Sequence, residues 1–237
     1  MLITTRAIVL RTVRHGDKSV VLKLYTEHHG VRGYAVRMGG KSGIPAALLE
    51  PMQRLVVVAH ERGDRELHHL KEVRPDKPYL SIGSDPIKGG VVLFVQEVLL
   101  RTLREESADP ALFEFIHDAL GVLDDETDLG HYPIGFLCGL CRQHGFAPEL
   151  PEGTVTWFDM MDGQFMDNEP AHPHAFSGEL VPLFAQLLET PLENASGVRA
   201  STSHRRALLE KLLHYFRLHV DGFGELRSPT VLQAVLG

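Results

Sequence analysis

The chain has 237 residues, of which 43% are hydrophobic and 23% are charged, and its formal net charge is −7. This composition excludes a disordered tail, a collagen-like fibre and a disulfide scaffold, and the length suffices for one large domain or two small ones. No apolar run approaches the ~18 residues of a membrane span, the first residues lack the pattern of a signal peptide, and two cysteines cannot staple a chain of this size. We expect a soluble, cytoplasmic protein with no membrane partner.

The first third of the sequence has the pattern of short β-strands. Runs rich in β-branched and apolar residues end at Gly-containing turns and are not interrupted by a long helical pattern. The expected strands are Thr5–Arg14, Ser19–Thr26, Val31–Met38, Leu55–His60 and Glu66–Val73. Five strands in about 75 residues are typical of an OB-fold barrel.

After residue 78 the periodicity becomes helical. Asp85-Pro86 and Asp109-Pro110 each combine an N-cap residue with a proline that can begin a helix. The expected helical segments are Val91–Leu103, Ala111–Leu123, Ile134–His144, Ser177–Leu188, Ser201–Val220 and Ser228–Leu236. Thr154–Met166 predicts a β-hairpin with Asp162-Gly163 at its turn. The fold class is therefore α+β: an OB-fold barrel over residues 1–78 and a helical domain over residues 79–237, with a hairpin insert at about 150–176.

The net charge conceals an asymmetry between these two parts. Residues 1–75 contain 13 Lys and Arg against 7 Asp and Glu, whereas residues 76–237 contain 11 against 24. A basic segment joined to an acidic one is a recognised feature of nucleic-acid-binding proteins.

Basic side chains in the barrel are the predicted DNA-binding residues. Phosphate backbones favour such a density of positive charge through counterion release, without any requirement for base sequence. The set is Arg6, Arg11, Arg14, Lys18, Lys23, Arg32, Arg37, Lys41 and Arg54. The alternative is that half of them are ordinary outward-facing strand residues. Tyr25 and Tyr34 are the only aromatic residues before residue 79 that could stack on bases, so we expect contacts mainly to phosphates and a steep salt dependence.

Other motifs in the sequence favour structural interpretations. Gly40-Lys41-Ser42 lacks the first glycine of a P-loop and is followed by Pro45, so a basic loop between strands is expected instead. Cys138, Cys141 and His144 are residue types that can bind a metal ion, and His172 and His174 lie about thirty residues later. Both cysteines, however, fall on an apolar helical stripe, which predicts that they pack in the core. The acidic run Asp124-Asp125-Glu126 is interpreted as a solvated turn. No motif of a hydrolase, zincin or dinucleotide-binding enzyme occurs, and we expect no catalytic residues.

Several segments resemble the RecO family of bacterial DNA repair proteins. These segments are Ala7–Thr12, the turn at Gly16-Asp17, Leu24–Gly30, Gly39–Ser42, Phe146-x-Pro148, Tyr215–Ser228 and Leu232-Gln233. They span the whole chain and follow the family's order.

The resemblance implies an OB-fold followed by a helical domain, and a nucleoid-associated recombination mediator that is not an enzyme. Such a protein binds single- and double-stranded DNA, anneals complementary strands, and works with RecR, and often RecF, to load RecA onto strands coated by single-strand-binding protein. It also implies DNA contacts for Arg11, Arg37 and Lys41, whereas the remaining six basic residues rest on the charge argument alone.

The chain departs from the family in one region. Many members carry a four-cysteine zinc site where this chain has residues 154–179, which contain no cysteine. We expect that the family zinc site is lost, that no cofactor is bound, and that packing replaces the metal in the hairpin. The packing residues are expected to be Trp157, Phe158, Phe165 and Phe176.

The acidic helical domain is assigned to protein partners, with a local basic patch at Arg205, Arg206 and Lys211 that could accept the acidic tail of single-strand-binding protein. A solvated helix face is the alternative for this patch. For the whole chain, one alternative is a protein-only adaptor whose basic barrel binds an acidic partner, such as its own helical domain. A weaker one is a metal-dependent hydrolase using His172 and His174.

Overall fold

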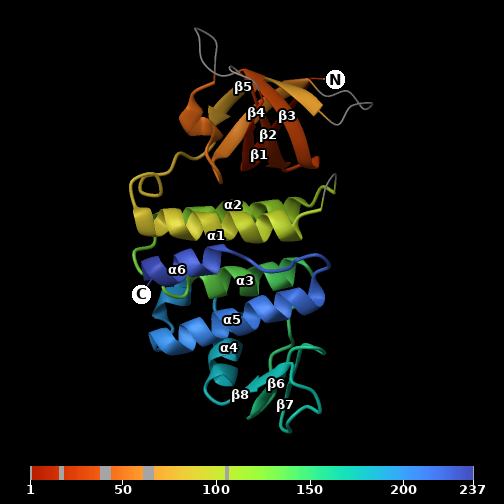
Figure 1. The fold of residues 1–237 in the computed structure, drawn as a ribbon, viewed down its shortest axis with the longest axis vertical. Helices are drawn as coiled ribbons and strands as arrows, with labels where there is room; N and C mark the ends of the chain where they lie inside the picture. Colours follow the sequence, from red (N-terminus) through yellow and green to blue (C-terminus); the bar gives the residue numbers. More distant parts are fainter. Residues whose placement is uncertain (1, 16–18, 38–43, 61–66, 105–106, 237) are drawn as a thin grey trace.

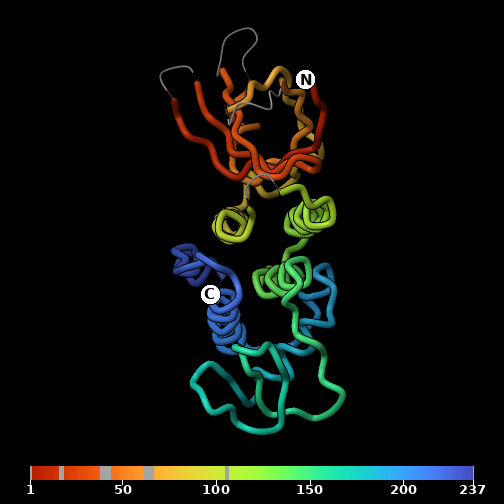
Figure 2. Tube along the Cα trace, turned by 90° about the vertical axis from the view of Figure 1, so that its right-hand side faces the viewer, coloured from red at the N-terminus to blue at the C-terminus, as the bar shows by residue number. Residues whose placement is uncertain are grey.

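A computed structural model describes residues 2–15, 19–37, 44–60, 67–104 and 107–236. The molecule is elongated and layered (Figure 1): a β-barrel lies at one end, α1 and α2 lie directly beneath it, α3, α5 and α6 form the next layer, and α4 with a small sheet lies at the far end. Figure 2 shows the same order of layers after a 90° turn, and in this view the strands of the barrel surround its interior. None of the helices in the described residues combines the length and the apolar character needed to cross a membrane.

The barrel has the strand order of an OB-fold. Its strands are β1 (Leu2–Arg14), β2 (Ser19–Thr26), β3 (Gly30–Arg37), β4 (Arg54–His60) and β5 (Leu67–Pro75). They close in the order β1-β2-β3-β5-β4, β3 and β5 pair in parallel, and all other pairs are antiparallel. The short 3-10 helix η1 (Ala46–Leu49) precedes β4 and adds Leu49 to the barrel core. The predicted five-stranded barrel is confirmed.

Strand β1 contributes to two hydrophobic cores at once. Ala7 and Val9 belong to the core inside the barrel, whereas Ile8 and Leu10 belong to a larger core shared with the helices. This double role explains why residues 7–10 are all buried although a half-buried strand alternates. The helices therefore pack directly against the outside of the barrel, and the larger core spans the junction while the core inside the barrel stays separate.

The helical region contains six α-helices among the described residues. They are α1 (Pro86–Thr102), α2 (Pro110–Asp125), α3 (Tyr132–Gln143), α4 (Leu180–Glu189), α5 (Thr202–His219) and α6 (Ser228–Leu236), with the 3-10 helix η2 (Leu192–Gly197) before α5. The predicted N-caps are confirmed: the Asp85 side chain accepts from the amides of Ile87 and Lys88, and the Asp109 side chain accepts from that of Leu112. Helix α1 begins at Pro86, as the Asp85-Pro86 start signal predicts, and continues through the apolar run that begins at Val91.

The predicted hairpin forms β6 (Trp157–Asp159) and β7 (Gln164–Met166), and Gly163 adopts the left-handed conformation (φ 66°) at its turn. A third strand, β8 (Ala175–Ser177), pairs with the free edge of β6 and was not predicted; the sequence predicts a helical segment from Ser177, which is instead the last residue of this strand, and α4 begins at Leu180. Phe158 lies at the centre, with its ring centroid 4.8 Å from that of Phe165 and 5.2 Å from that of Phe176. These contacts agree with the expected packing of this insert, in which Trp157 is only half-buried.

Candidate nucleic-acid interface

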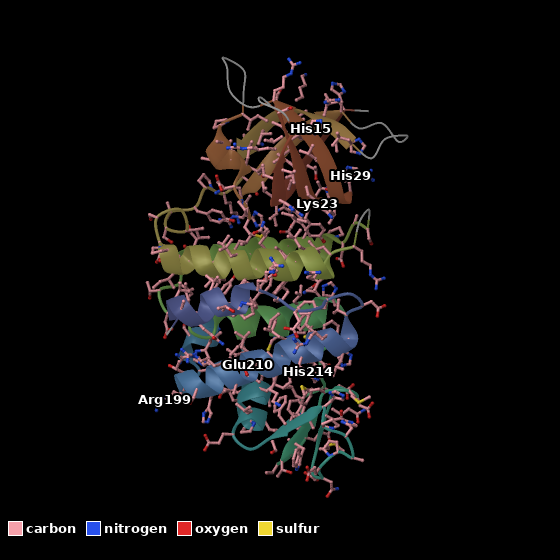
Figure 3. The ribbon with its side chains drawn as sticks, in the orientation of Figure 1. His15, Lys23, His29, Arg199, Glu210 and His214 are labelled. Carbon is pink, nitrogen blue, oxygen red and sulfur yellow. The ribbon has the colours of Figure 1, made fainter. Side chains whose placement is uncertain are left out.

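Three predicted DNA-binding residues share the outer face of the β1-β2-β3 sheet. Arg11 on β1 lies directly opposite Lys23 on β2, and Lys23 in turn lies opposite Gly33 on β3. Arg37 lies on the same outer face, at the far end of β3 and opposite Ser19. Leu22 and Leu24, which flank Lys23, point into the barrel core. Because strand side chains alternate, Lys23 and its cross-strand neighbours must point outward. Figure 3 shows Lys23 on the barrel near the helices, with His15 toward its other end.

The orientation of Arg11 depends on a β-bulge. The pairing of β1 with β2 runs from Val9 opposite Leu24 to Arg11 opposite Lys23, so Leu10 is the extra residue. Without this insertion Arg11 would have the same orientation as Val9, which is buried in the barrel core. The bulge therefore turns the Arg11 guanidinium outward while Leu10 packs against the helices.

Arg11, Arg14 and Arg37 are exposed, and none of them forms a hydrogen bond or an ion pair with another described residue. Arg14 lies near the end of β1, opposite Val20. Arg32 is half-buried on β3: its Nε donates to the backbone oxygen of His29 at 3.2 Å, and one terminal nitrogen lies 3.4 Å from Nε2 of His68. Arg14 lies opposite Val20 and Arg32 lies opposite Leu24, and both of these partners point into the barrel core, so Arg14 and Arg32 do not belong to the outer face of Arg11, Lys23 and Arg37.

Arg6 points instead at the helical region. Its guanidinium forms a bidentate ion pair with Glu27, at 2.9 Å for each nitrogen, and also binds Glu114 on α2. It lies over the Phe113 ring, 5.3 Å from the centroid. The hydrogen bonds with Glu27 and Glu114 raise the pKa of Arg6, and the bond with Arg6 lowers the pKa of Glu27. Arg6 therefore joins the barrel to α2.

The prediction that Arg54 contacts DNA needs correction. Arg54 is 5% exposed; it donates to the backbone oxygen of His117 at 3.2 Å, and its guanidinium lies 4.6 Å from the centroid of the Tyr79 ring. A side chain covered in this way cannot reach a phosphate, so Arg54 is a structural residue of the junction. This burial could not be predicted from the sequence, because the residues that cover Arg54 lie more than 20 positions away along the chain.

Two predicted DNA-binding residues, Lys18 and Lys41, lie outside the described residues, as do the Gly16-Asp17 turn and the Gly40-Lys41-Ser42 loop. Both tyrosines of the barrel are described, and neither is available to stack on a base: Tyr25 is 1% and Tyr34 is 0% exposed. Tyr25 donates its hydroxyl to the backbone oxygen of Asp109 at 3.1 Å, which helps to dock β2 onto the start of α2. Burial raises the pKa of Tyr25. Phosphate contact without base stacking is the chemistry that this face offers.

The predicted partner-binding residues lie on α5. Arg206 is exposed, Lys211 is half-exposed, and Arg205 is held by the backbone oxygen of Ala200 at 2.9 Å and by the Thr202 hydroxyl at 3.1 Å. Arg205 and Arg206 border a small apolar cleft between the start of α3, α5 and α6, to which Ile134, Leu209, Leu232 and Leu236 contribute. Two guanidinium groups beside an apolar cleft suit an acidic peptide that also carries apolar side chains.

Cys138 and Cys141 are completely buried, which confirms the core-packing interpretation. Burial raises the pKa of Cys138 to about 12 and raises that of Cys141 as well, so both sulfurs remain thiols at neutral pH. Burial lowers the pKa of His144.

His172 and His174 have partners in and beside the small sheet. Nε2 of His172 lies 3.1 Å from a carboxylate oxygen of Asp159, and Nδ1 of His174 lies 2.9 Å from Nε2 of His214 on α5. These contacts tie the loop before β8 to β6 and to α5, which is a structural role. Figure 3 shows His214 on α5, next to the small sheet.

The interpretation of Asp124 as part of a solvated turn is wrong. Asp124 is 7% exposed, and its carboxylate accepts hydrogen bonds from the amides of Leu80, Ser81 and Ile82 at 2.7, 2.8 and 3.0 Å. Burial acts to raise the pKa of Asp124, but these hydrogen bonds outweigh it and hold the pKa below its usual value. Asp124 thereby fixes the segment between barrel and helices to the end of α2; its neighbour Asp125 is exposed.

Comparison with known proteins identifies relatives over the whole length. The sequence model described as "Recombination protein O N terminal" matches residues 1–79, and the one described as "Recombination protein O C terminal" matches residues 83–228. Proteins named DNA repair protein RecO from Christiangramia forsetii and Flavobacterium psychrophilum are each 29% identical to the chain, over 240 and 239 residues. The alignments cover 100% of both chains in the first case and 99% of both in the second. The protein of that name from Porphyromonas gingivalis strain W83 is also 29% identical, with 99% of each chain covered.

Proposed function

Because the chain belongs to the recombination protein O family, and so has a role in DNA repair and recombination, we propose that it is a recombination mediator and not an enzyme. It binds single- and double-stranded DNA and anneals complementary strands. With RecR, and with RecF where that protein takes part, it helps RecA to load onto DNA coated by single-strand-binding protein.

The observation that carries the DNA-binding proposal is the pairing of Arg11 with Lys23 across two strands, with Arg37 on the same outer face. Like charges placed opposite each other on a sheet destabilise it. A phosphate backbone lying across the two side chains makes the electrostatic interaction favourable, because each phosphate then lies between cations. We propose Arg11, Lys23 and Arg37 as the DNA-binding face of the described barrel, with further contacts from Arg14 and Arg32 on the other side of their strands and from Lys18 and Lys41.

Strand annealing follows from the same neutralisation of charge. Two single strands repel each other through their phosphates, and covering part of one backbone lowers that repulsion. Because Tyr25 and Tyr34 are buried, the barrel holds the backbone without stacking on the bases. The bases stay free to pair with a complementary strand.

The helical region is the proposed partner-binding part. Its surplus of acidic residues repels DNA over most of its surface. The cleft beside Arg205 and Arg206, with Lys211 nearby on α5, instead combines positive charge with apolar walls. We assign this cleft to the acidic tail of single-strand-binding protein. The insert at β6-β8 is held by aromatic packing around Phe158, and we propose that it needs no zinc of its own.

The test is fluorescence anisotropy of a labelled single-stranded oligonucleotide, titrated with the full chain at several salt concentrations. The full chain is required because Ile8, Leu10, Tyr25 and Val31 belong to the core shared with the helices, and a fragment ending at residue 78 would expose them. The variants are Arg11→Ala and the double variant Arg11→Ala/Arg37→Ala. The matched control is Arg199→Ala, which removes one exposed positive charge from the helical region, away from Lys23 (Figure 3).

Each lost phosphate contact is expected to reduce the slope of log K against log[salt] by about 0.7 for single-stranded DNA, so the double variant loses about 1.4. Arg199→Ala is expected to leave the slope unchanged. An unchanged slope in the double variant would show that this face is not the DNA-binding surface. Absence of binding by the unmodified chain at ~50 mM salt would instead favour the adaptor function, in which the basic barrel meets an acidic protein.

A further inference from the structure

Three potential metal ligands lie together on one turn of α2, at the junction with the barrel. Glu114, His117 and Asp118 each offer one ligand atom within 4.8 Å of the other two, and Nδ1 of His117 lies 3.6 Å from Oδ1 of Asp118. Spacings of three and four residues place these side chains on one face of a helix. Ligands at about 2.0–2.2 Å from a zinc ion lie about 3–3.5 Å from each other. The Asp118 side chain is 72% exposed, so it can rotate to close the remaining gap.

His117 carries an unused ligand atom in this cluster. The side chain is 1% exposed, and its Nε2 lies 2.9 Å from a carboxylate oxygen of Asp76, at the end of the barrel. A carboxylate only accepts, so in the neutral ring Nε2 carries the proton and Nδ1 keeps its lone pair. Nδ1 is buried and has no hydrogen-bond partner among the described residues. An imidazole held by a carboxylate at one nitrogen, with the other nitrogen free, is the arrangement that orients histidine ligands in metal sites.

The charges around this turn favour a cation. The carboxylates of Glu27, Asp76, Glu114 and Asp118 lie around this turn; among the described residues Arg6 pairs with Glu27 and Glu114, and Nε2 of His28 lies 3.7 Å from Glu27. Both oxygens of Glu114 accept hydrogen bonds from Arg6, which Glu27 also holds through two bonds at 2.9 Å, so a metal bound by Glu114 would share its carboxylate with Arg6 while Glu27 keeps Arg6 in place. Arg54 donates to a backbone oxygen, not to these carboxylates.

We propose that this turn of α2 binds a divalent transition-metal ion, best matched by zinc, through Nδ1 of His117 and one oxygen each of Glu114 and Asp118. Water completes the coordination, and Asp76 orients the imidazole. One nitrogen and two carboxylate oxygens with an open position are a ligand set that zinc accepts. Because Asp76 and Arg6 belong to the barrel, the ion stabilises the contact between barrel and helices. The site is distinct from the β6-β8 insert, which lies at the other end of the molecule (Figure 1).

The experiment is equilibrium titration of the full chain with Zn²⁺ by calorimetry, repeated with Co²⁺, whose absorption spectrum reports its ligands. Asp118→Asn removes a ligand from an exposed position with little effect on folding. Asp118→His replaces it by another ligand and should restore binding. Asp125→Asn, an exposed carboxylate on the same helix, is the matched control, and His214→Gln tests the separate His174–His214 pair.

Asp118→Asn is expected to weaken zinc binding at least about tenfold, whereas Asp125→Asn and His214→Gln leave this site unchanged. The cobalt complex should show no thiolate charge-transfer band, because both cysteines are buried thiols. The proposal is overturned if the unmodified chain does not bind zinc or if Asp118→Asn binds it as tightly. It is also overturned if binding disappears with His214→Gln and survives Asp118→Asn.

Discussion

Replacing Asp124 by asparagine is expected to destabilise the protein although the side chain keeps its shape. One carboxylate oxygen accepts from the amides of Ser81 and Ile82 and from the Ser81 hydroxyl, and the other accepts from the amide of Leu80 at 2.7 Å. The amide oxygen of asparagine can replace the first oxygen, but its NH₂ group then faces the Leu80 amide. One charge-assisted hydrogen bond is lost, and a partly buried donor is left unsatisfied.

A hydrogen bond to a charged group contributes about 1.5–3 kcal/mol, and the three remaining bonds weaken when the charge disappears. The expected loss is therefore about 2–3 kcal/mol, a large fraction of the roughly 5–15 kcal/mol that stabilises a domain. In urea unfolding this corresponds to a midpoint lower by about 1 M. The control is Asp125→Asn, which should lie within about 0.5 kcal/mol of the unmodified protein because Asp125 is exposed.

The pH dependence gives a second readout. The folded-state pKa of Asp124 lies below its unfolded value of 3.8, so its contribution is complete above that value and is lost as the pH falls through the folded pKa. The difference between the unmodified protein and Asp124→Asn should therefore be constant near neutral pH and shrink below about pH 4. Equal urea midpoints for Asp124→Asn and Asp125→Asn would refute the reasoning.

Three further predictions concern the helical region. Burial lowers the pKa of His131, which is 3% exposed, so the unfolded chain binds a proton at this residue more tightly and the stability falls as the pH drops below 6.5. His131→Leu should make this fall in stability less steep by up to about 1.4 kcal/mol per pH unit, measured by thermal melts between pH 8 and 5. Parallel stability curves for the variant and the unmodified protein would contradict this prediction. Gly139→Ala places a Cβ 2.4 Å from the Phe115 ring, so it should lower the free energy of unfolding by about 1–3 kcal/mol and lower the melting temperature. Gly89→Ala, whose Cβ has nothing within 4 Å, should raise the free energy of unfolding by about 0.5–1 kcal/mol and raise the melting temperature. Melting-temperature shifts in the same direction would show that the space around the new Cβ does not decide whether the substitution stabilises the protein. Phe158→Ala should cost about 3–5 kcal/mol in urea unfolding because its ring packs against three other phenylalanines, and a cost below about 1 kcal/mol would mean that aromatic packing does not hold the insert.

The strands, most helix starts and the hairpin turn could be predicted from the sequence because their causes are local. The five barrel strands follow from β-branched runs between turns, and Asp85, Asp109 and Ser201 cap their helices as their chemistry dictates. Gly163 marks its turn because a left-handed residue is required there. The basic character of the barrel is also a property of composition alone.

Which basic residues face solvent was decided only by the tertiary structure. Arg11 points outward because of one bulged residue, Leu10, that packs on the helices, whereas Arg54 is covered by Tyr79 and by the helix carrying His117. Asp124 and His117 likewise take their roles from partners more than 40 residues away along the chain. Periodicity within a segment reports which residue types can be buried. It does not report which distant surface covers them, because that depends on how the barrel and the helices pack together.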